Sequence, residues 1–217
     1  MKVAIITGAG SGIGLGTAKK MHAAGLAIVG VGRDTAKLDA LAAALGDERV
    51  ATLSADVTAD DAPQRIVQCA LDRFGSVDFL VNNAGLGSPT PLHETDDAKL
   101  DLFLDVMLRA PFRLCREAIG HMGPGSGVVN VTSTFAMIGG KRGGPYSAAK
   151  GGLKSLTEHM AAEYGPRGIR SNCVAPGVTM TEAVRADILA TARRRLGPAV
   201  APREIAEASI PKTRSGK

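Results

Sequence analysis

The sequence has few residues of the kinds that hold metal ions or disulfide frameworks. Its 217 residues include three cysteines and four histidines, which are scattered along the chain. It has no Cys-x-x-Cys pair, and no histidine stands beside a cysteine. Zinc sites and disulfide scaffolds need such clusters. We therefore expect no metal site, and we interpret the cysteines as small buried hydrophobic residues.

Long apolar runs are also absent. The apolar start, Val3 to Ile6, is too short for a signal peptide and runs directly into glycines. No run approaches the roughly 20 apolar residues that cross a bilayer. We therefore expect a cytoplasmic protein with no membrane partner.

Positive charge is in modest excess and is not concentrated in one region. Lysine and arginine total 26 against 21 acidic residues, a net charge of +5, and only Arg193–Arg195 and the last residues before Lys217 form basic groups. A nucleic-acid-binding surface needs a clustered basic face, usually within a known motif. We expect no nucleic-acid partner, and the excess could equally help to attract an anionic cofactor or a carrier-bound substrate.

Short apolar runs alternate with longer helical stretches over most of the chain. Six runs read as buried strands: Val3–Ile6, Ala27–Val31, Val50–Leu53, Val77–Val81, Val128–Thr132 and Ile169–Val174. Helices are expected at Gly12–Ala24, Thr35–Leu45, Asp60–Phe74, Asp96–His121, Tyr146–Tyr164, Thr181–Leu196 and Arg203–Ser209. This alternation indicates an α/β fold with a parallel sheet covered on both faces. Right-handed crossovers make it a three-layer, doubly wound, Rossmann-like sheet, and the length suits a single domain over residues 1–217.

A glycine-rich segment, Thr7 to Gly14, joins the first strand to the first helix. Such a loop is weak evidence alone, but a strand before it and a helix after it are the context of a dinucleotide site. Glycines let backbone N–H groups approach a pyrophosphate, and the helix N-terminus adds partial positive charge. The alternative is a plain glycine-rich turn. We expect these residues to bind a dinucleotide: Gly8, Ser11, Gly12, Ile13 and Gly14.

Further motifs follow in order along the chain. They are Asp56-Val57, Asn82-Asn83-Ala84-Gly85, Tyr146-Ser147-Ala148-Ala149-Lys150 and Pro176-Gly177-Val178-Thr179-Met180-Thr181. With the glycine loop, they make the chain resemble the short-chain dehydrogenases/reductases, and within them the 3-oxoacyl-reductase-like subgroup. The resemblance implies an NAD(P)-dependent oxidoreductase that interconverts an alcohol and a carbonyl in a small molecule. It also implies a homodimer or homotetramer.

The same resemblance implies the remaining site residues. Contacts to the cofactor are implied for Asp56, Val57, Asn83, Ala84, Gly85, Tyr146, Lys150, Pro176, Gly177 and Thr181. Catalytic roles are implied for Ser133, Tyr146 and Lys150. In this assignment the serine hydroxyl polarises the substrate carbonyl, and the lysine also bonds the nicotinamide ribose.

Tyr146 and Lys150 stand four residues apart on a predicted helix, so they share one face. Reducing a carbonyl requires a hydride and a proton for the developing alkoxide. A tyrosine hydroxyl, with an ordinary pKa of about 10, is a poor acid–base group until a nearby ammonium favours the tyrosinate. The pair therefore fits a proton donor and the cation that tunes it.

The end of the second strand bears on the choice of cofactor. NAD-preferring family members usually place an acidic residue where this chain has Gly32, and here Arg33 follows. A guanidinium can meet the 2′-phosphate of NADP in a charge-assisted contact. Asp34 lies close by, and Ser11 adds no charge to the glycine loop. We expect NADP, with NAD as the alternative and an exposed loop arginine as the other interpretation of Arg33.

Two departures from the family pattern leave a second function open. Met107 stands where the family has an asparagine that extends the proton path, and a thioether is only a weak acceptor. We also expect the usual last strand to be missing or replaced, and residues 179–217 to form a substrate-covering segment and an atypical tail. The alternative is a dinucleotide-binding protein with weak or no catalysis that acts through association or sensing.

Overall fold

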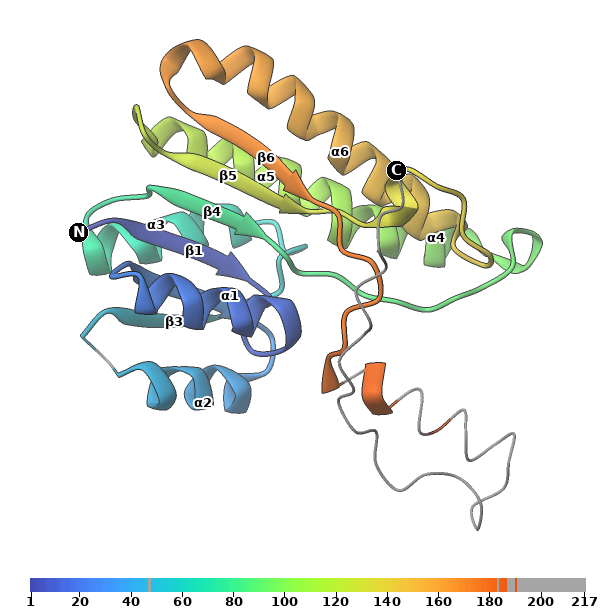
Figure 1. Cartoon of the computed structure of the whole chain (residues 1–217), viewed down its shortest axis with the longest axis horizontal. Helices are drawn as coiled ribbons and strands as arrows, with labels where there is room; N and C mark the ends of the chain where they lie inside the picture. The colour runs from blue at the N-terminus through green and yellow to red at the C-terminus, as the bar shows by residue number, and fades with distance from the viewer. Residues whose placement is uncertain (47, 183, 187–189, 191–217) are drawn as a thin grey trace, which may run out of the picture. The chain divides into compact units, whose positions relative to one another are not determined.

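Six parallel strands form one sheet, and they correspond to the six strands that the sequence predicts (Figure 1). Their bounds are β1 (Val3–Thr7), β2 (Ala27–Gly32), β3 (Val50–Ser54), β4 (Phe79–Asn82), β5 (Gly127–Val131) and β6 (Arg170–Val174). The order across the sheet is β3-β2-β1-β4-β5-β6. The direction of winding reverses between β1 and β4. In a doubly wound sheet, ligands bind in the crevice beyond the carboxyl ends of the strands at this reversal.

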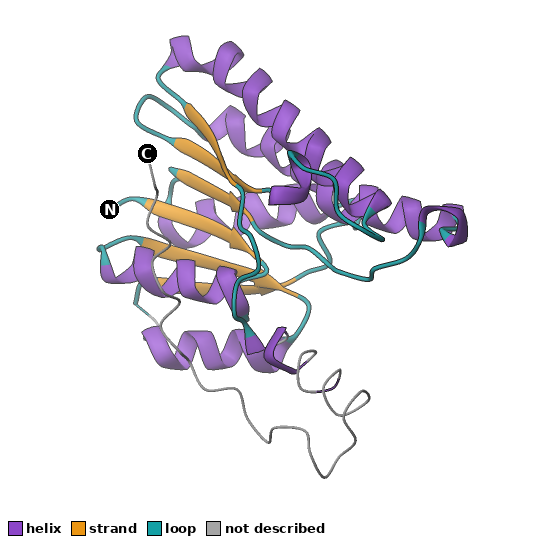
Figure 2. Cartoon of the chain, turned by 45° about the vertical axis from the view of Figure 1, so that its right-hand side comes forward, coloured by secondary structure: helices purple, strands orange, loops and turns teal. Residues whose placement is uncertain are grey.

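Helices cover both faces of the sheet, as Figure 2 shows. The main ones are α1 (Gly12–Ala23), α2 (Thr35–Leu45), α3 (Ala62–Phe74), α4 (Asp97–Leu104), α5 (Ala110–Ala118) and α6 (Gly144–Tyr164). Alternate residues of β1 point to opposite faces. Val3 and Ile5 pack in a core with α3, α5 and α6, whereas Ala4 and Ile6 pack in a core with α1 and α2. The predicted three-layer Rossmann-like architecture is therefore confirmed.

The helix predicted from Asp96 to His121 is not continuous. Between α4 and α5, Asp105–Arg109 form a π-helical turn, η2, in which the Ala110 N–H donates to the Asp105 carbonyl five residues back. Pro111 has no N–H and cannot complete the ordinary helical ladder at this point. The wider turn is a common solution at functional sites, and the prediction of an uninterrupted helix is wrong here.

Single turns of 3₁₀ helix connect several of these elements. They are η1 (Leu92–Glu94), η3 (Ile119–His121), η4 (Thr134–Ala136) and η5 (Gly165–Arg167). The turn η4 begins after the two residues that follow β5, and η5 leads from α6 toward β6. The first of these two shapes the loop that carries Ser133.

This computed structural model describes residues 1–46, 48–182, 184–186 and 190. The chain divides into two units, Met1–Gly177 and Val178–Lys217. In the second unit, Glu182 and residues 184–186 are helical, within the predicted helix Thr181–Leu196. The predicted helix Arg203–Ser209 and the end of the chain lie outside the described residues, so the replacement of the last strand and the substrate-covering role of residues 179–217 stay predictions.

Candidate active site

The glycine loop begins at the carboxyl end of β1 and runs into α1. Gly8 and Gly12 adopt left-handed backbone conformations, with φ of 68° and 52°, which suit glycine and strain other residues. Ser11 is the N-cap of α1, and its side chain makes no capping hydrogen bond. The first N–H groups of a helix have no partner within it, so this end of α1 can accept an anionic group.

The end of β4 holds the glycine loop in place. Asn83 donates from Nδ2 to the carbonyl oxygens of Thr7 and Gly8, at 2.9 and 3.3 Å. The Thr7 hydroxyl accepts from the backbone N–H groups of Asn83 and Ala84, both at 3.0 Å. Thr7 was not among the predicted site residues, although it precedes the first glycine of the motif. It ties together the two strands that flank the crevice.

Two positions of this loop, Gly8 and Gly14, have no room for a side chain. A Cβ at Gly14 would lie 2.2 Å from the Gly8 carbonyl oxygen and 2.5 Å from Asn83 Nδ2. A Cβ at Gly8 would lie 2.8 Å from the same Asn83 atom. The backbone cradle therefore depends on the absence of side chains at both positions. Its shape and its helix N-terminus fit the pyrophosphate of a dinucleotide.

Arg33 and Asp56 lie near each other beyond the ends of β2 and β3. The Asp56 carboxylate accepts from the Thr58 N–H at 2.9 Å and from its hydroxyl at 2.7 Å. These two hydrogen bonds, with a smaller contribution from Arg33, lower the pKa of Asp56. Arg33 Nη1 is 4.0 Å from Asp56 Oδ2, and its side chain is 80% exposed. An exposed pair at this distance is weak, so the guanidinium can turn to an anionic ligand.

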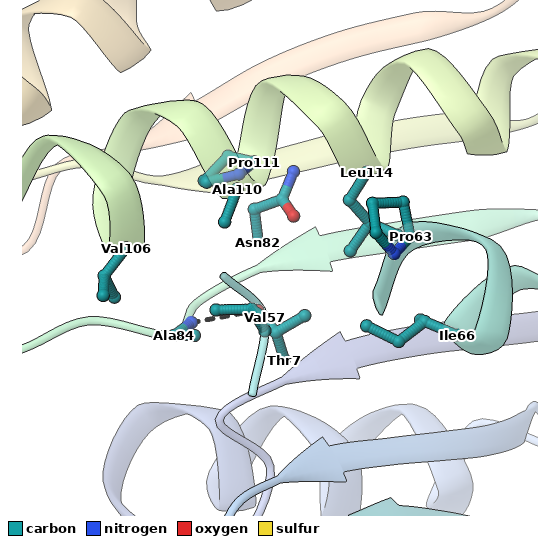
Figure 3. A pocket seen from close by; sticks show the side chains of 10 residues that line it. All are labelled: Thr7, Val57, Pro63, Ile66, Asn82, Ala84, Val106, Ala110, Pro111 and Leu114. Carbon is teal, nitrogen blue, oxygen red and sulfur yellow. Dashed lines mark hydrogen bonds between the residues drawn. The ribbon is translucent and has the colours of Figure 1, made fainter. Parts of the chain in front are cut away.

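A small apolar cavity lies beside Ala84 at the carboxyl ends of β1 and β4 (Figure 3). Its lining residues are Thr7, Val57, Pro63, Ile66, Asn82, Ala84, Val106, Ala110, Pro111 and Leu114. The volume of about 10 Å³ is room for no more than about one water. Two of the predicted cofactor residues, Val57 and Ala84, thus line the same small cavity.

Lys150 is buried at the start of α6, with 4% of the residue exposed. Its Nζ donates to the carbonyl oxygen of Val131 at 2.6 Å, at the end of β5. The same nitrogen is 5.9 Å from the centroid of the Tyr146 ring. Burial lowers the pKa of Lys150 from 10.5 to about 8. The ammonium is therefore held between the sheet and the tyrosine that precedes it on the helix.

Ser133 lies two residues beyond Val131 and is the N-cap of η4. Its side chain is buried, and its Oγ accepts from the Phe135 N–H at 3.2 Å. The Phe135 ring meets the Tyr146 ring edge-on, with centroids 6.0 Å apart. A Cβ on Gly140 would lie 2.2 Å from the Phe135 ring, so the following loop wraps closely around it. Contacts of the β5 end thus reach both Tyr146 and Lys150.

Met107 is fully buried in the π-helical turn. It packs with Phe103, Ala149 and Tyr146. A Cβ on Gly85 would lie 3.5 Å from its sulfur. The side chain therefore fills space between the Asn-Asn-Ala-Gly segment and α6. At this position it offers only a weak acceptor to a proton path.

The Pro-Gly segment is divided between the two units. Pro176 accepts at its carbonyl oxygen from the Thr134 N–H at 3.2 Å, so it lies beside the turn that follows Ser133. Gly177 ends the first unit. Thr181 belongs to the second unit, where its hydroxyl accepts from the Val184 N–H at 3.3 Å. Its contact with a cofactor stays a prediction.

Two kinds of feature are absent from the part of the chain that the structure describes. Among these residues, no group of three or more His, Cys, Asp or Glu could hold a metal ion. No helix within the same residues is long and apolar enough to cross a membrane.

The parallel order of the strands and the glycine cradle at their reversal define a dinucleotide-binding α/β protein. The chain belongs to the short-chain dehydrogenase family, whose model matches residues 2–190. It is accordingly an NAD(P)-dependent oxidoreductase that acts on small molecules. The 3-oxoacyl-reductase subgroup stays a prediction.

Two relatives illustrate the range of substrates among similar sequences. A cis-4-hydroxycyclohexanecarboxylate dehydrogenase of Sinomonas cyclohexanicum is 40% identical over 217 aligned positions, covering 95% of this chain and 87% of the relative. An A-factor type γ-butyrolactone 1′-reductase of Streptomyces virginiae is 36% identical, covering 84% of this chain and 74% of the relative. The names of these two relatives give different substrates, a hydroxycyclohexanecarboxylate and a γ-butyrolactone.

Solved structures with the same fold extend the comparison. A short-chain dehydrogenase from Brucella melitensis has a TM-score of 0.83 and 35% identity, covering 88% of this chain and 77% of that one. The L-sorbose reductase of Gluconobacter frateurii, solved with NADPH and L-sorbose, has a TM-score of 0.85 and 29% identity, covering 91% of this chain and 77% of that one. Both structures agree with the doubly wound fold described above.

Proposed function

We propose that this protein interconverts a carbonyl compound and its alcohol with NADP(H), and that Ser133, Tyr146 and Lys150 carry the reaction. The observation that carries this proposal is the buried Lys150 ammonium, which lies under the Tyr146 ring and is fixed by the Val131 carbonyl oxygen. A buried cation at this place has a cost unless it is used or paired. Its position near the Tyr146 ring supports a role for that residue's hydroxyl.

The roles of the three residues follow from their chemistry. A reduced nicotinamide held in the crevice would supply the hydride that the carbonyl carbon accepts. Tyr146 gives its hydroxyl proton to the carbonyl oxygen, and the Lys150 ammonium stabilises the phenolate that remains. The Ser133 hydroxyl donates a hydrogen bond to the same oxygen as its negative charge develops. In the oxidation of an alcohol, the same proton returns to the tyrosine.

The preference for NADP rests on Arg33. Its exposed guanidinium stands one residue beyond β2, and its contact with Asp56 is long and weak. A 2′-phosphate would give it a stronger charge-assisted partner. Gly32 leaves no carboxylate at the end of β2 to repel that phosphate.

Replacing Arg33 with glutamine is expected to raise the Kd of NADPH by roughly 10- to 100-fold and to leave the Kd of NADH within about twofold, since a hydrogen bond to a charged group contributes about 1.5–3 kcal/mol. Fluorescence titrations of both cofactors at low salt measure the change. Arg116→Gln, at an exposed position of α5, removes the same charge elsewhere and should leave both constants unchanged. Equal weakening of both cofactors in Arg33→Gln would contradict the assignment.

The alkaline side of the pH profile is expected to report on Lys150. Its pKa of about 8 lies below the ordinary value, so the ammonium is present at lower pH and is lost as the pH rises through about 8. The kcat/KM for NADPH, measured at saturating carbonyl compound, reports on the free enzyme and should fall over this range. In Lys150→Arg the charge persists, and this limb should disappear even if the rate is low. An unchanged limb in that variant would assign it to another group.

Met107 favours a second candidate function, a dinucleotide-binding protein with weak or no catalysis. The buried thioether stands where the family places an asparagine in the proton path, and it lies beside Tyr146. Steady-state oxidation of NADPH with a panel of ketones, keto sugars and 3-oxoacyl thioesters separates the two candidates. Tight binding of NADPH without turnover of any carbonyl would support the second and overturn the first.

A further inference from the structure

Three polar side chains form a buried chain of hydrogen bonds from β4 to α6. Asn82 donates from Nδ2 to Asn130 Oδ1 at 2.8 Å. Asn130 donates from its own Nδ2 to Thr157 Oγ1 at 2.9 Å, and that hydroxyl donates to the Leu153 carbonyl oxygen at 2.7 Å. The exposed fractions of Asn82, Asn130 and Thr157 are 3%, 0% and 3%. We refer to these three residues as the Asn–Asn–Thr chain.

The Asn–Asn–Thr chain lies in a part of the core that is otherwise apolar. Asn82 Nδ2 also lies 3.2 Å from the Cys115 sulfur of α5, and burial raises the pKa of that thiol to about 12, so the thiol is neutral. Polar groups in such surroundings are costly unless they are bonded. Bonded ones are strong and admit few alternative arrangements. The Asn–Asn–Thr chain therefore specifies how β4, β5 and α6 fit together.

Thr157 lies on the same face of α6 as Lys150, because seven residues are close to two helical turns. The two side chains contact adjacent residues of β5. Thr157 accepts from Asn130, and Lys150 donates to the Val131 carbonyl oxygen. Two polar contacts thus pin α6 to one strand, one near the start of the helix and one further along it.

The remaining contacts of this helix face are less selective. Leu153 and Met160 are buried on it, and the hydrophobic contacts of such side chains have no preferred direction. The long side chain of Lys150 can also follow such a shift. The Asn130–Thr157 hydrogen bond is directional and lies at a fixed point of β5. It therefore constrains the position of α6 along the strand more narrowly than the apolar contacts do.

We propose that Asn130 and Thr157 are positioning residues for the reaction, which act by fixing α6 so that Tyr146 and Lys150 stand at the carboxyl end of β5. The proposal rests on the catalytic roles proposed above for that tyrosine and lysine. A displacement of about 1 Å in a reacting group can lower a rate by roughly 100-fold. Asn130 and Thr157 bond to each other and to the Leu153 carbonyl oxygen and lie apart from the glycine loop and Arg33, so binding of the adenine and pyrophosphate part of the cofactor should change little when their bond is lost.

The test is Thr157→Val, which keeps the shape of the side chain and removes its hydroxyl. We expect kcat to fall by roughly 10- to 100-fold, while the KM and Kd of NADPH change by less than about twofold. Thr157→Ser restores the hydroxyl and should recover kcat to within about threefold of the kcat of the unmodified protein. If Thr157→Val is not obtained folded, Thr157→Cys keeps a weak acceptor and should show an intermediate loss of kcat.

Val67→Ala is the matched control. Val67 is buried in the same core on α3 and takes no part in the hydrogen-bonded chain. This variant should lower the unfolding midpoint and leave kcat unchanged. If Thr157→Val lowers the midpoint in the same way without changing kcat, the Asn–Asn–Thr chain is structural only and the proposal is overturned.

The proposed function is tested separately by Tyr146→Phe in the same assay. If Tyr146→Phe retains full turnover, the catalytic assignment fails, whatever Thr157→Val does. If Tyr146→Phe is inactive and Thr157→Val is fully active, only the positioning role fails. If both lose kcat and Thr157→Ser recovers it, both proposals are supported.

Discussion

Replacing Tyr146 with phenylalanine is expected to lower kcat by roughly 10²- to 10⁴-fold, the usual contribution of a general acid. The change removes only the hydroxyl that gives its proton to the substrate. The ring contacts to Phe135 and to the Met107 cluster are kept, because phenylalanine has the same ring. The Kd of NADPH and the unfolding midpoint should therefore stay close to those of the unmodified protein. Single-turnover oxidation of NADPH, with the Kd measured on the same sample, tests this.

The sequence supplies a matched control, since it contains two tyrosines. Tyr164 is the last residue of α6, and its ring packs near the Arg167 guanidinium, at the opposite end of the helix from Tyr146. Tyr164→Phe should leave kcat within about twofold. The catalytic assignment would be wrong if Tyr146→Phe behaved like Tyr164→Phe.

Replacing Gly14 with alanine is expected to weaken dinucleotide binding strongly. The new Cβ would lie 2.2 Å from the Gly8 carbonyl oxygen, which is backbone and cannot move without opening the loop. Forcing a methyl group into a packed site usually costs about 1–3 kcal/mol. Here that cost falls on the cradle itself. We expect a Kd for NADPH roughly 10- to 100-fold higher and a lower unfolding midpoint.

Gly16→Ala in the same helix controls for the general effect of the substitution. A Cβ at Gly16 would have no heavy atom within 4 Å of it, and alanine favours a helix over glycine by about 1 kcal/mol. This variant should bind NADPH normally and unfold at a slightly higher temperature. Titration and thermal unfolding of both variants, with and without NADPH, test the pair. Equal affinity for NADPH in Gly14→Ala and Gly16→Ala would show that the cradle is not the dinucleotide site.

The central strands β1 and β2 could be predicted because each is a short apolar run buried on both faces. Val3 and Ile5 point to one helical layer, and Ala4 and Ile6 to the other. The π-helical turn could not be predicted in the same way. Its apolar periodicity resembles that of an ordinary helix, and Pro111 alone does not specify how the missing hydrogen bond is accommodated.

The glycine loop and the Tyr146–Lys150 pair could be predicted because each function needs particular residue types at fixed local spacing. The contacts that position them depend on residues far apart in sequence. Thr7 meets the N–H groups after β4, and Asn130 meets Thr157 on α6. A lone threonine or a lone asparagine in an apolar run carries no sign of its partner. Such residues become visible only when the strands are in place.

Transfer of deuterium from NADPH is the most direct test of the account. NADPH with deuterium at the transferable position of the nicotinamide ring is incubated with the protein and a panel of carbonyl compounds, and the products are analysed by mass spectrometry. We predict an alcohol with one deuterium on its carbinol carbon, formed by the unmodified protein and not by Tyr146→Phe. Binding of NADPH without a deuterated alcohol from any carbonyl, or equal formation by both proteins, would contradict it.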